Sequence, residues 1–425
     1  MSKQSRREWL KMIAALQGAL LLPGSLDAAT AGKKHPTLLV VSGWQDVNIG
    51  DIAHTPGLLH ILEQYLPDAR IILWKKSSNN EPVARMLHKG FPKVSIIYGN
   101  VDADKRVSAP GLLDAFQQAD LMIHGSGPSV VGADNLRAWV NQTGKPFGIF
   151  GTTIQEINTE LASLLKRASF IFTRETASLE NLAKAGITAM PRLFAPDATF
   201  RLHLRDDQKA LPFLREKGLE PGKFICAVPR LRYTPYHKIR KVDWSEEKIR
   251  QVEETNKKHG EADHAKLREA IIAWVRNTGN RVLVCPEMTY AVDIMDDLLI
   301  NPLPEDVKPM VLKRGYWLPD EAASIYARAK AVLSFECHSP IIALAAGVPA
   351  FYLRQPEDTI KGQMYYDLEA DDWVFEIEQT SGKQIADRLM ELVSDPDETA
   401  ARVKRIGRNV KKQYNEAFTV VKRLI

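Results

Sequence analysis

The stretch AVLSFECHSPIIALAAGVPAFYL, residues 331–353, carries the pattern that decides the fold. It begins with a short, mainly apolar run, AVLSF, and ends with a second one, VPAFYL. Such runs are typical of strands that are buried on both faces of a parallel sheet. Between them lies PIIALAAG, an apolar helical segment that ends at a glycine, a common helix stop signal. The stretch therefore predicts a strand–helix–strand unit, with ECHS in the turn after the first strand.

The same alternation extends along the chain. The run PTLLVVSGW, residues 36–44, predicts a buried strand, and TPGLLHILEQYLP, residues 55–67, has apolar residues at the three- and four-residue spacing of a helix. Further strand and helix patterns alternate through both halves of the chain. The sequence thus predicts two doubly wound, Rossmann-like α/β domains, residues 36–204 and 223–395, joined by a linker at residues 205–222.

Two segments stand outside this alternation. Residues 237–263 are highly charged and contain few apolar residues, which predicts a solvent-facing helical insertion; a lid over a cleft is the alternative. Residues 396–425 are basic and strongly helical, and predict a C-terminal helix. Ligands bind at the carboxyl ends of the strands in doubly wound sheets. We therefore expect the two domains to face each other across a cleft that holds the active site.

The N-terminal segment has the features of an export signal. Arg6 and Arg7 precede an apolar run, residues 12–22, which is too short to span a bilayer. The sequence ATA at residues 29–31 resembles a cleavage site, and the paired arginines resemble a twin-arginine signal. We expect residues 1–31 to be a signal peptide and the protein to be exported to the periplasm or another extracytoplasmic compartment. The alternative is an amphipathic N-terminal helix of a cytosolic protein.

The composition narrows the class of protein. Of the 425 residues, 45% are apolar and 26% are charged, as in soluble globular proteins. The net charge of +5 is small and the basic residues are dispersed, so nucleic-acid binding is not indicated. Beyond the leader no apolar segment is long enough to span a membrane, so stable membrane insertion is not expected after signal removal. The three cysteines show no metal-like spacing and are expected to be buried thiols.

Small and polar residues follow the predicted strands of the first domain. Asn48, Gly50 and Asp51 lie between the first strand and its helix, where backbone donors and the helix dipole favour an anion. A turn in which Asp51 caps the helix is compatible with this. A small-residue loop after a later strand adds further candidates for substrate binding. These candidates are Gly125, Ser126 and Gly127, followed later in the chain by Arg174.

The second domain offers charged residues at its strand ends. Arginines in such places suit a carboxylate or a phosphate, although each is as well explained by a surface ion pair. A histidine in a strand-to-helix turn that faces a cleft can act as a general acid or base. The candidates for substrate binding are Arg230, Arg232, Tyr233, Glu287 and Lys361, and those for catalysis are Glu336 and His338 together with Asp51 of the first domain.

Taken together, the motifs resemble those of the polysaccharide pyruvyl transferase family. The resemblance rests on NIGD at 48–51, HGSGPS at 124–129, FTRETASLENLAKAGI at 172–187, PDATF at 196–200 and SFECHSPIIALAAGVPAFYL at 334–353. It implies a two-domain glycosyltransferase-B architecture. It also implies the transfer of a pyruvyl group, as a ketal, from phosphoenolpyruvate to a sugar of a cell-surface glycan. Members of the family need no metal as a rule, so no cofactor is expected.

The resemblance also assigns positions. Asn48, Gly50 and Asp51 match the N-terminal loop of the family, and Gly125, Ser126 and Gly127 match its glycine loop. Arg174, Glu175 and Ser178 match a segment that usually reads Arg-Asp/Glu-x-x-Ser. By the same resemblance, His338 is expected to meet the donor phosphate or to act as the acid.

One position departs from the family pattern. Where the family commonly reads Ser-x-Arg-x-His, this chain has Ser334-Phe335-Glu336-Cys337-His338. A glutamate near an anionic donor replaces attraction by repulsion, which costs roughly 4 kcal/mol for charges about 4 Å apart at an effective dielectric constant near 20. We therefore expect weak binding of phosphoenolpyruvate unless Arg230 or Arg232 compensates. Export points the same way, because phosphoenolpyruvate is a cytoplasmic metabolite.

Two alternatives to the transferase stay open. The first is an exported carbohydrate-active hydrolase, in which Glu336 or Glu287 works with His338 or Asp51 on a glycosidic or ketal bond. The second is a glycan-binding protein that keeps the cleft without the chemistry. The expected partner is a sugar or glycan in each case. The sequence does not specify the acceptor sugar, the linkage or the oligomeric state.

Overall fold

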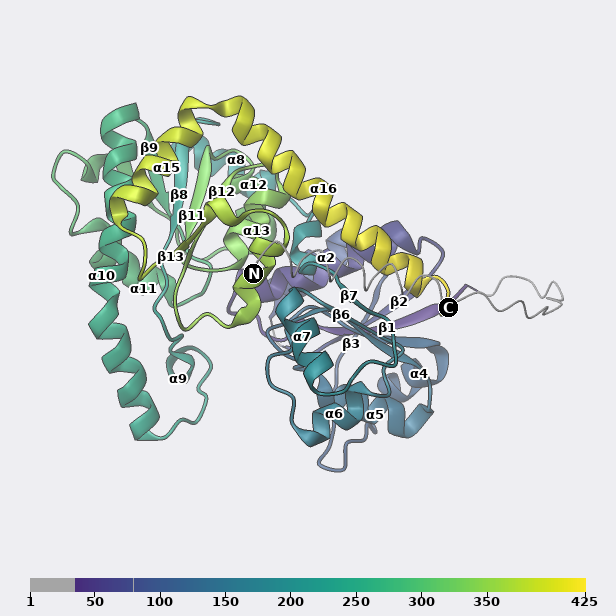
Figure 1. Ribbon diagram of the computed structural model, residues 1–425. Helices are drawn as coiled ribbons and strands as arrows, with labels where there is room; N and C mark the ends of the chain where they lie inside the picture. Colours follow the sequence, from purple (N-terminus) through teal and green to yellow (C-terminus); the bar gives the residue numbers. More distant parts are fainter. Residues whose placement is uncertain (1–34, 79) are drawn as a thin grey trace. The chain divides into compact units, whose positions relative to one another are not determined.

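A computed structural model describes residues 35–78 and 80–425 (Figure 1). The expected signal peptide, residues 1–31, lies outside the described residues. Residues 36–425 pack as one unit that contains two parallel β-sheets with helices against them. Within the described part of the chain, no helix is long and apolar enough to cross a membrane.

The first sheet has the strand order β3-β2-β1-β4-β5-β6-β7, and every neighbouring pair is parallel. Its strands are β1 (Thr37–Ser42), β2 (Arg70–Lys75), β3 (Ser95–Ile97), β4 (Leu121–His124), β5 (Phe147–Thr152), β6 (Phe170–Thr173) and β7 (Arg192–Phe194). Its helices are α2 (Ile49–Tyr65), α3 (Glu81–Gly90), α4 (Pro110–Gln118), α5 (Ala133–Thr143), α6 (Thr159–Leu165) and α7 (Thr176–Lys184), with the turn η1 (Ala198–Arg201). The order reverses between β1 and β4, which is where ligands bind in such sheets.

The second sheet repeats the scheme with the order β10-β9-β8-β11-β12-β13, reversing between β8 and β11. Its strands are β8 (Phe224–Val228), β9 (Arg281–Val284), β10 (Val311–Lys313), β11 (Ala331–Ser334), β12 (Ala350–Arg354) and β13 (Val374–Glu376). Its helices are α8 (Asp207–Glu216), α9 (Tyr236–Ile239), α10 (Glu246–Thr278), α11 (Ala291–Met295), α12 (Pro319–Tyr326), α13 (His338–Ala345), α14 (Gln363–Asp367), α15 (Gly382–Ser394) and α16 (Pro396–Val421). Short turns complete it: η2 (Asp296–Ile300), η3 (Lys308–Met310), η4 (Ile360–Gly362) and η5 (Asp371–Trp373). The predicted pair of doubly wound domains is confirmed.

The opening stretch forms β11, α13 and β12, as its pattern predicts. Strand β11 is fully buried between β8 and β12. Helix α13 is apolar almost throughout and buried almost all round, because α2, α12, α16 and η1 pack against it besides its own sheet. The helix therefore begins at His338 inside the molecule, at the place where the two sheets meet.

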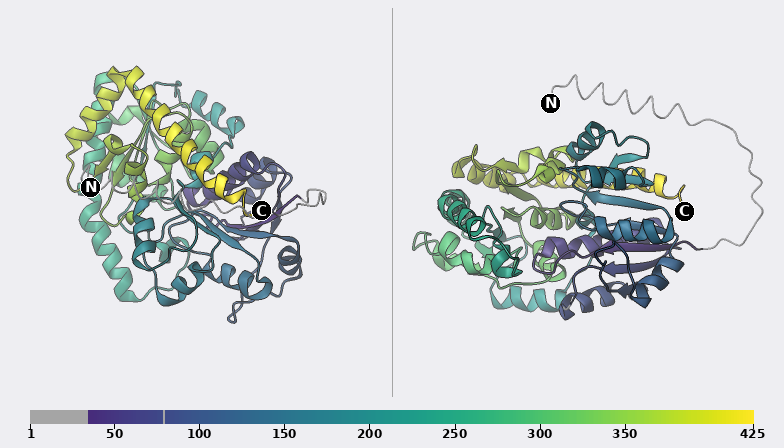
Figure 2. Two further views of the ribbon diagram at one scale, coloured as in Figure 1. Left: turned by 45° about the vertical axis from the view of Figure 1, so that its right-hand side comes forward. Right: turned by 90° about the horizontal axis from the view of Figure 1, so that it is seen from below.

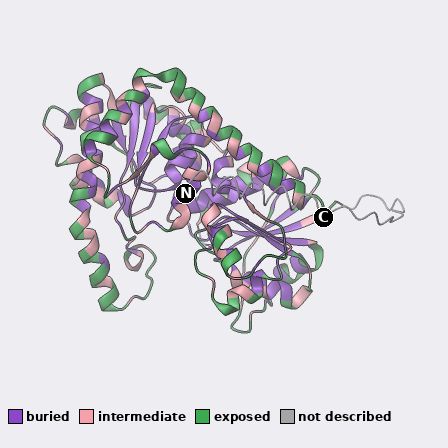
Figure 3. Ribbon diagram, in the orientation of Figure 1, coloured by how far each residue is buried: buried purple, intermediate pink, exposed green. Residues whose placement is uncertain are grey.

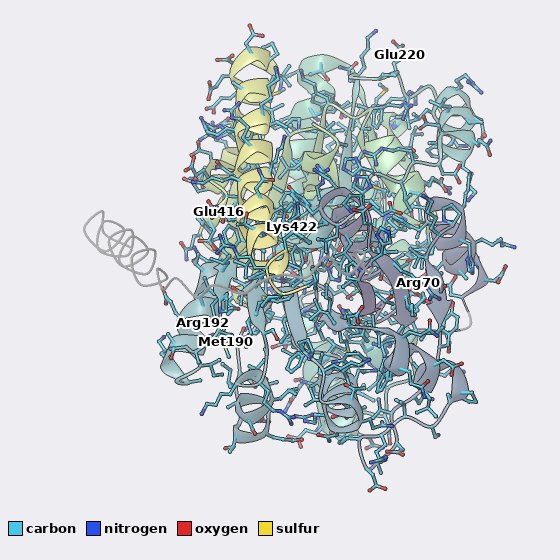
Figure 4. The ribbon with its side chains drawn as sticks, turned by 90° about the vertical axis from the view of Figure 1, so that its right-hand side faces the viewer. Arg70, Met190, Arg192, Glu220, Glu416 and Lys422 are labelled. Carbon is cyan, nitrogen blue, oxygen red and sulfur yellow. The ribbon has the colours of Figure 1, made fainter. Side chains whose placement is uncertain are left out.

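The C-terminal helix α16 extends from the second sheet to the first (Figures 1 and 2). One face is buried and the other is exposed, as expected for an amphipathic helix (Figure 3). The Tyr414 hydroxyl donates to the backbone oxygen of Asp197 at 2.8 Å, and the ring of Phe418 stacks on Tyr65 at 4.8 Å. Figure 4 shows the end of α16 that carries Glu416 and Lys422.

Several elements differ from the sequence expectations. Residues 205–222, the predicted linker, contain the helix α8, which packs against α12 of the second sheet. The charged insertion is not a separate excursion, because most of it belongs to α10, which runs without a break into the helix predicted after it. The three-residue edge strands β7, β10 and β13 were not predicted. All three cysteines are buried and free, as expected.

Candidate functional site

The loops at the carboxyl ends of the two sheets are hydrogen-bonded to each other. The Ile49 amide donates to the Glu287 oxygen at 2.9 Å, and the Thr289 amide donates to the Val47 oxygen at 3.0 Å. A second contact joins α7 to α14, where Asp367 accepts from the amide of Thr176 at 2.7 Å and from its hydroxyl at 2.8 Å. These contacts join the two sheets where a cleft was expected. We call this region of contact the domain seam.

The NIGD motif shapes the first-sheet side of the domain seam. The Asn48 side chain caps α2 by accepting from the amides of Gly50 at 2.6 Å and Asp51 at 3.2 Å. The cap is thus Asn48 and not Asp51, and it occupies amides that were expected to bind an anion. Asp51 instead accepts from the Gln45 side chain at 2.5 Å. A Cβ on Gly50 would lie 2.2 Å from the ring of His338, so the glycine permits that histidine to approach α2.

Two histidines and an aspartate meet at the domain seam. His54 Nε2 lies 3.0 Å from His338 Nε2 and 3.2 Å from Asp197 Oδ2, and His338 Nε2 lies 3.8 Å from the same oxygen. All three residues are buried. We call them the His–His–Asp cluster. His54 was not predicted from the sequence, although its place one turn after Asp51 on the same helix was an available signal.

Glu287 orients His338. Its Oε1 accepts from His338 Nδ1 at 3.1 Å, and its Oε2 accepts from the amide and the hydroxyl of Ser339 at 2.6 and 2.7 Å. Burial by itself raises the pKa of Glu287, but the hydrogen bonds and charge from His338 and the hydrogen bonds from Ser339 outweigh it and leave the pKa below its ordinary value. Glu287 was predicted to bind substrate. The structure shows its side chain fully buried and hydrogen-bonded to His338 and Ser339.

Arg174 supports the cluster from the first sheet. Its Nη1 donates to Asp197 Oδ2 and its Nε donates to the Thr153 hydroxyl, both at 2.7 Å. Burial alone raises the pKa of Asp197, but the charge and hydrogen bond of His54 and the charge of Arg174 hold it well below its ordinary value. Glu175 accepts from Ser178 and from Thr153. The family's Arg-Glu-x-x-Ser segment is therefore an internal network.

The glycine loop after β4 is packed tightly. The Ser126 hydroxyl accepts from the Ala198 amide at 3.0 Å, and Trp44 Nε1 donates to the Ser126 oxygen at 2.6 Å. A Cβ on Gly125 would meet Ser42 Oγ at 2.9 Å, and a Cβ on Gly127 would meet Trp44 Nε1 at the same distance. The three small residues therefore allow close packing at the β1–β4 reversal.

A hollow of about 370 Å³ lies directly beyond this loop. It is lined by residues 128–130 and 153–156, by Asn158 and Leu161, and by Thr359 of the second sheet's loops. Thr153 also accepts from Arg174, so the hollow borders the network under the His–His–Asp cluster. Its size and place suit a sugar-sized ligand at a strand-end site.

A second charged group, the Arg230 group, lies at the reversal between β8 and β11. Arg230 Nη1 donates to Asp358 Oδ1 at 2.5 Å, and Lys361 Nζ lies 3.3 Å from the same oxygen. Glu336 Oε2 lies 3.5 Å from Arg230 Nε. Arg230 Nε and Glu336 Oε1 are both buried without a hydrogen-bond partner among the described residues. Such orphan atoms are uncommon in folded proteins.

The surroundings of Glu336 bear on the repulsion that was expected between its carboxylate and an anionic donor. Burial, the largest cause, raises the pKa of Glu336 to about 8, and the positive charge of Arg230 offsets only part of that rise. A raised pKa reduces the negative charge that Glu336 carries near neutral pH, and Arg230 Nε lies 3.5 Å from its Oε2.

Two predicted residues lie outside this group. Arg232 makes a two-pronged ion pair with Asp263 at 2.9 and 3.0 Å, and it also donates to Glu378 at 2.7 Å. The guanidinium donors of Arg232 are thus occupied by carboxylates, which favours the interpretation of Arg232 as part of an ion pair. Tyr233 is 40% exposed, with Lys248 of α10 over its ring at 5.6 Å.

The charged insertion reaches the first sheet. The Tyr236 hydroxyl of α9 lies 3.4 Å from Gln45 Nε2, and Gln45 is the residue that donates to Asp51. Arg240 Nη1 also lies within 3.5 Å of Gln45 Oε1. This part of the insertion contacts Gln45, which precedes the NIGD loop, whereas the N-terminal half of α10 is mostly exposed.

Solved structures show the same architecture. The UDP-GlcNAc 2-epimerase of Neisseria meningitidis aligns with a TM-score of 0.57 at 12% identity, covering 91% of this chain and 100% of that one. HepE of Anabaena, in complex with UDP-glucose, has a TM-score of 0.54 at 14% identity and covers 92% and 98%. Phytolacca americana UGT2 has a TM-score of 0.53 at 11% identity and covers 90% and 95%. At these identities the likeness shows the fold alone, which is glycosyltransferase-B-like.

Sequence comparison adds the family. No curated protein matches the chain in sequence. The family model for polysaccharide pyruvyl transferase matches residues 48–355, which run from the NIGD loop to just past β12 and include the His–His–Asp cluster together with Arg230 and Glu336. The chain therefore belongs to the polysaccharide pyruvyl transferase family, and it is a polysaccharide-modifying transferase by that membership.

Proposed function

We propose that the protein transfers a pyruvyl group from phosphoenolpyruvate to two hydroxyls of one sugar in an envelope glycan. Both hydroxyl oxygens form bonds to C2 of the donor, and the C2–O bond to phosphate breaks. One hydroxyl proton ends on C3, which becomes a methyl group, and the other leaves with inorganic phosphate. The reaction is a ketal formation without net oxidation or reduction, so it needs no further reactant.

The observation that carries this proposal is the Arg230 group. Two basic side chains, the buried Arg230 and the partly buried Lys361, converge on one carboxylate at the strand reversal, and Arg230 Nε has no hydrogen-bond partner among the described residues. A donor with a carboxylate and a phosphate is the kind of ligand that such cations bind. The reversal point is also where a doubly wound sheet places its ligand.

The neighbouring groups suit the rest of the reaction. His338 is held by Glu287 through Nδ1, and its Nε2 faces His54 and Asp197 at the domain seam. The hollow beside the glycine loop, lined by Thr153 and Thr359, supports an acceptor sugar between the two sheets. Asp51, near the domain seam, is the carboxylate that we assign to the acceptor hydroxyl. Export, proposed from Arg6 and Arg7, would bring the enzyme to an envelope glycan.

The test is a calorimetric titration of phosphoenolpyruvate into the unmodified protein and into Arg230→Gln. We expect saturable binding that weakens about 10- to 100-fold in the variant, since a hydrogen bond to a charged group contributes about 1.5–3 kcal/mol. Arg85→Gln, on the exposed face of α3, is the matched control and should bind like the unmodified protein. Absence of binding by the unmodified protein would overturn the donor assignment.

A second arm addresses the hydrolase alternative. The same protein is incubated with pyruvylated and unmodified envelope glycans in the presence and absence of phosphoenolpyruvate. Release of phosphate that depends on both glycan and donor supports the transferase. Release of pyruvate or of sugars without donor would support hydrolysis instead and would contradict the proposal.

A further inference from the structure

The His–His–Asp cluster has the spacing of a metal site. The three atoms that face one another are His54 Nε2, His338 Nε2 and Asp197 Oδ2, separated by 3.0, 3.2 and 3.8 Å. In a tetrahedral zinc site with bonds of about 2.0–2.1 Å, neighbouring ligand atoms lie about 3.3 Å apart. The observed separations bracket that value, and each residue offers a ligand atom of the right type.

The groups behind the cluster hold these atoms in place. Glu287 accepts from His338 Nδ1, which leaves the lone pair of Nε2 pointing at the cluster. His54 Nδ1 is buried without a hydrogen-bond partner among the described residues, and Asp51 Oδ1 lies 4.0 Å away. A carboxylate behind a histidine is the usual outer contact of a metal-ligating imidazole.

Asp197 is fixed as well. Its Oδ1 accepts from the Thr199 amide at 2.9 Å, and its Oδ2 accepts from Arg174 and lies 3.2 Å from His54 Nε2. The supporting contacts come from separate elements, because His54 lies on α2, Asp197 before η1 and His338 at the start of α13. The cluster exists only when both sheets are folded and in contact.

The surrounding charges favour a cation. Three carboxylates, those of Asp51, Asp197 and Glu287, contact the two imidazoles within 4.0 Å, and one guanidinium, that of Arg174, contacts the cluster. Carboxylates thus outnumber the cationic side chain in a buried place. A dication bound between the two imidazoles would be attracted by these carboxylates.

We propose that His54, Asp197 and His338 bind one divalent transition-metal ion, with Zn²⁺ as the best match to two imidazoles and a carboxylate. Three protein ligands leave a fourth position for a water or a substrate oxygen, as in catalytic rather than structural zinc sites. Mg²⁺ and Ca²⁺ are excluded as matches because they prefer oxygen ligands. The further assignment of the fourth position to an oxygen of the donor rests on the proposed function; the metal site itself does not.

The test is a zinc titration of tag-free, full-length protein that has been stripped with a chelator and dialysed. Binding is measured in competition with a zinc-responsive dye. We expect one ion per chain, and at least 10-fold weaker binding by His54→Gln. The matched control is His203→Gln, which alters the other close histidine pair, His60 and His203, with ring centroids 4.2 Å apart. It should bind zinc like the unmodified protein.

Further measurements separate loss of the site from loss of the fold. Co²⁺ in the unmodified protein should give the intense visible absorption of a four-coordinate ion, and Zn²⁺ should displace it. Glu287→Gln should weaken binding about 10- to 100-fold, as outer-contact substitutions do. Circular dichroism identifies any variant that has not folded.

The proposal is overturned if the unmodified protein binds no zinc, if His54→Gln binds as tightly, or if His203→Gln loses the binding. Because zinc is titrated without phosphoenolpyruvate, the two proposals fail independently. Zinc binding without donor binding would refute the proposed function and keep the metal site, and donor binding without zinc binding would do the reverse.

Discussion

Acid should destabilise this protein through His124, the residue that precedes the glycine loop. His124 is completely buried, its Nε2 accepts from the Gly132 amide at 2.9 Å, and its ring stacks on Trp44 at 4.6 Å. Burial is the largest cause that lowers its pKa, from 6.5 to about 3. Below pH 6.5 the unfolded chain therefore takes up a proton that the folded protein refuses, and stability is lost as the pH falls from 6.5 towards 3.

The magnitude follows from the size of the shift. Each pH unit in this interval costs about 1.4 kcal/mol of folding free energy. At pH 5 the loss from His124 is about 2 kcal/mol, and at pH 4 it is about 3.4 kcal/mol. Both are large fractions of the stability of an ordinary domain.

The assay compares urea unfolding of the unmodified protein and His124→Gln at pH 7, 6 and 5. Glutamine keeps an acceptor for the Gly132 amide and does not titrate. The variant should be less stable at pH 7, because it loses the stacking on Trp44, but the difference should shrink by about 2 kcal/mol at pH 5. His88→Gln, at an exposed position of α3, is the control and should leave the slope unchanged. Parallel pH profiles for the unmodified protein and His124→Gln would refute the reasoning.

Three further predictions concern packing and the domain seam. Gly50→Ala should lower the free energy of unfolding by about 1–3 kcal/mol, since its Cβ would lie 2.2 Å from the His338 ring. Gly111→Ala, with open space around its Cβ, is the control and should be neutral or stabilising. Equal urea midpoints for the two variants would contradict this prediction. Asp367→Ala should cost about 2 kcal/mol by leaving the donors of Thr176 unpaired, and unchanged thermal unfolding would show that the two sheets do not depend on this contact. Tyr414→Phe should cost about 1 kcal/mol in denaturant unfolding through the lost bond to the Asp197 oxygen, with Tyr98→Phe at an exposed site as its neutral control.

The sequence predicts the central strands well, for a physical reason. Strands such as β1, β8 and β11 are buried on both faces, so each leaves a continuous apolar run. The edge strands β7, β10 and β13 have three residues each and were not predicted. The two halves of α10 were predicted as separate segments, because the first half has almost no buried residue before Gly260. The backbone helix is nevertheless continuous.

The candidate site was predicted in parts. Strand-end positions identified His338, Arg230 and Lys361, because the carboxyl ends of parallel strands meet at one edge. His54 was missed because its partner lies 284 residues away on α13, a pairing that only the fold reveals. The raised pKa of Glu336 likewise results from its burial by residues that are distant in the sequence, so no local sequence pattern predicts it.

The helix α16 makes the first sheet depend on a segment that lies far from it in the sequence. Its residues Tyr414 and Phe418 pack on Phe150 of β5, so this helix covers part of the first sheet after the chain has passed through the second. A truncation before Tyr414 would therefore uncover an aromatic surface on the first sheet, and its effect should be felt in the domain that is distant from the deleted residues in sequence.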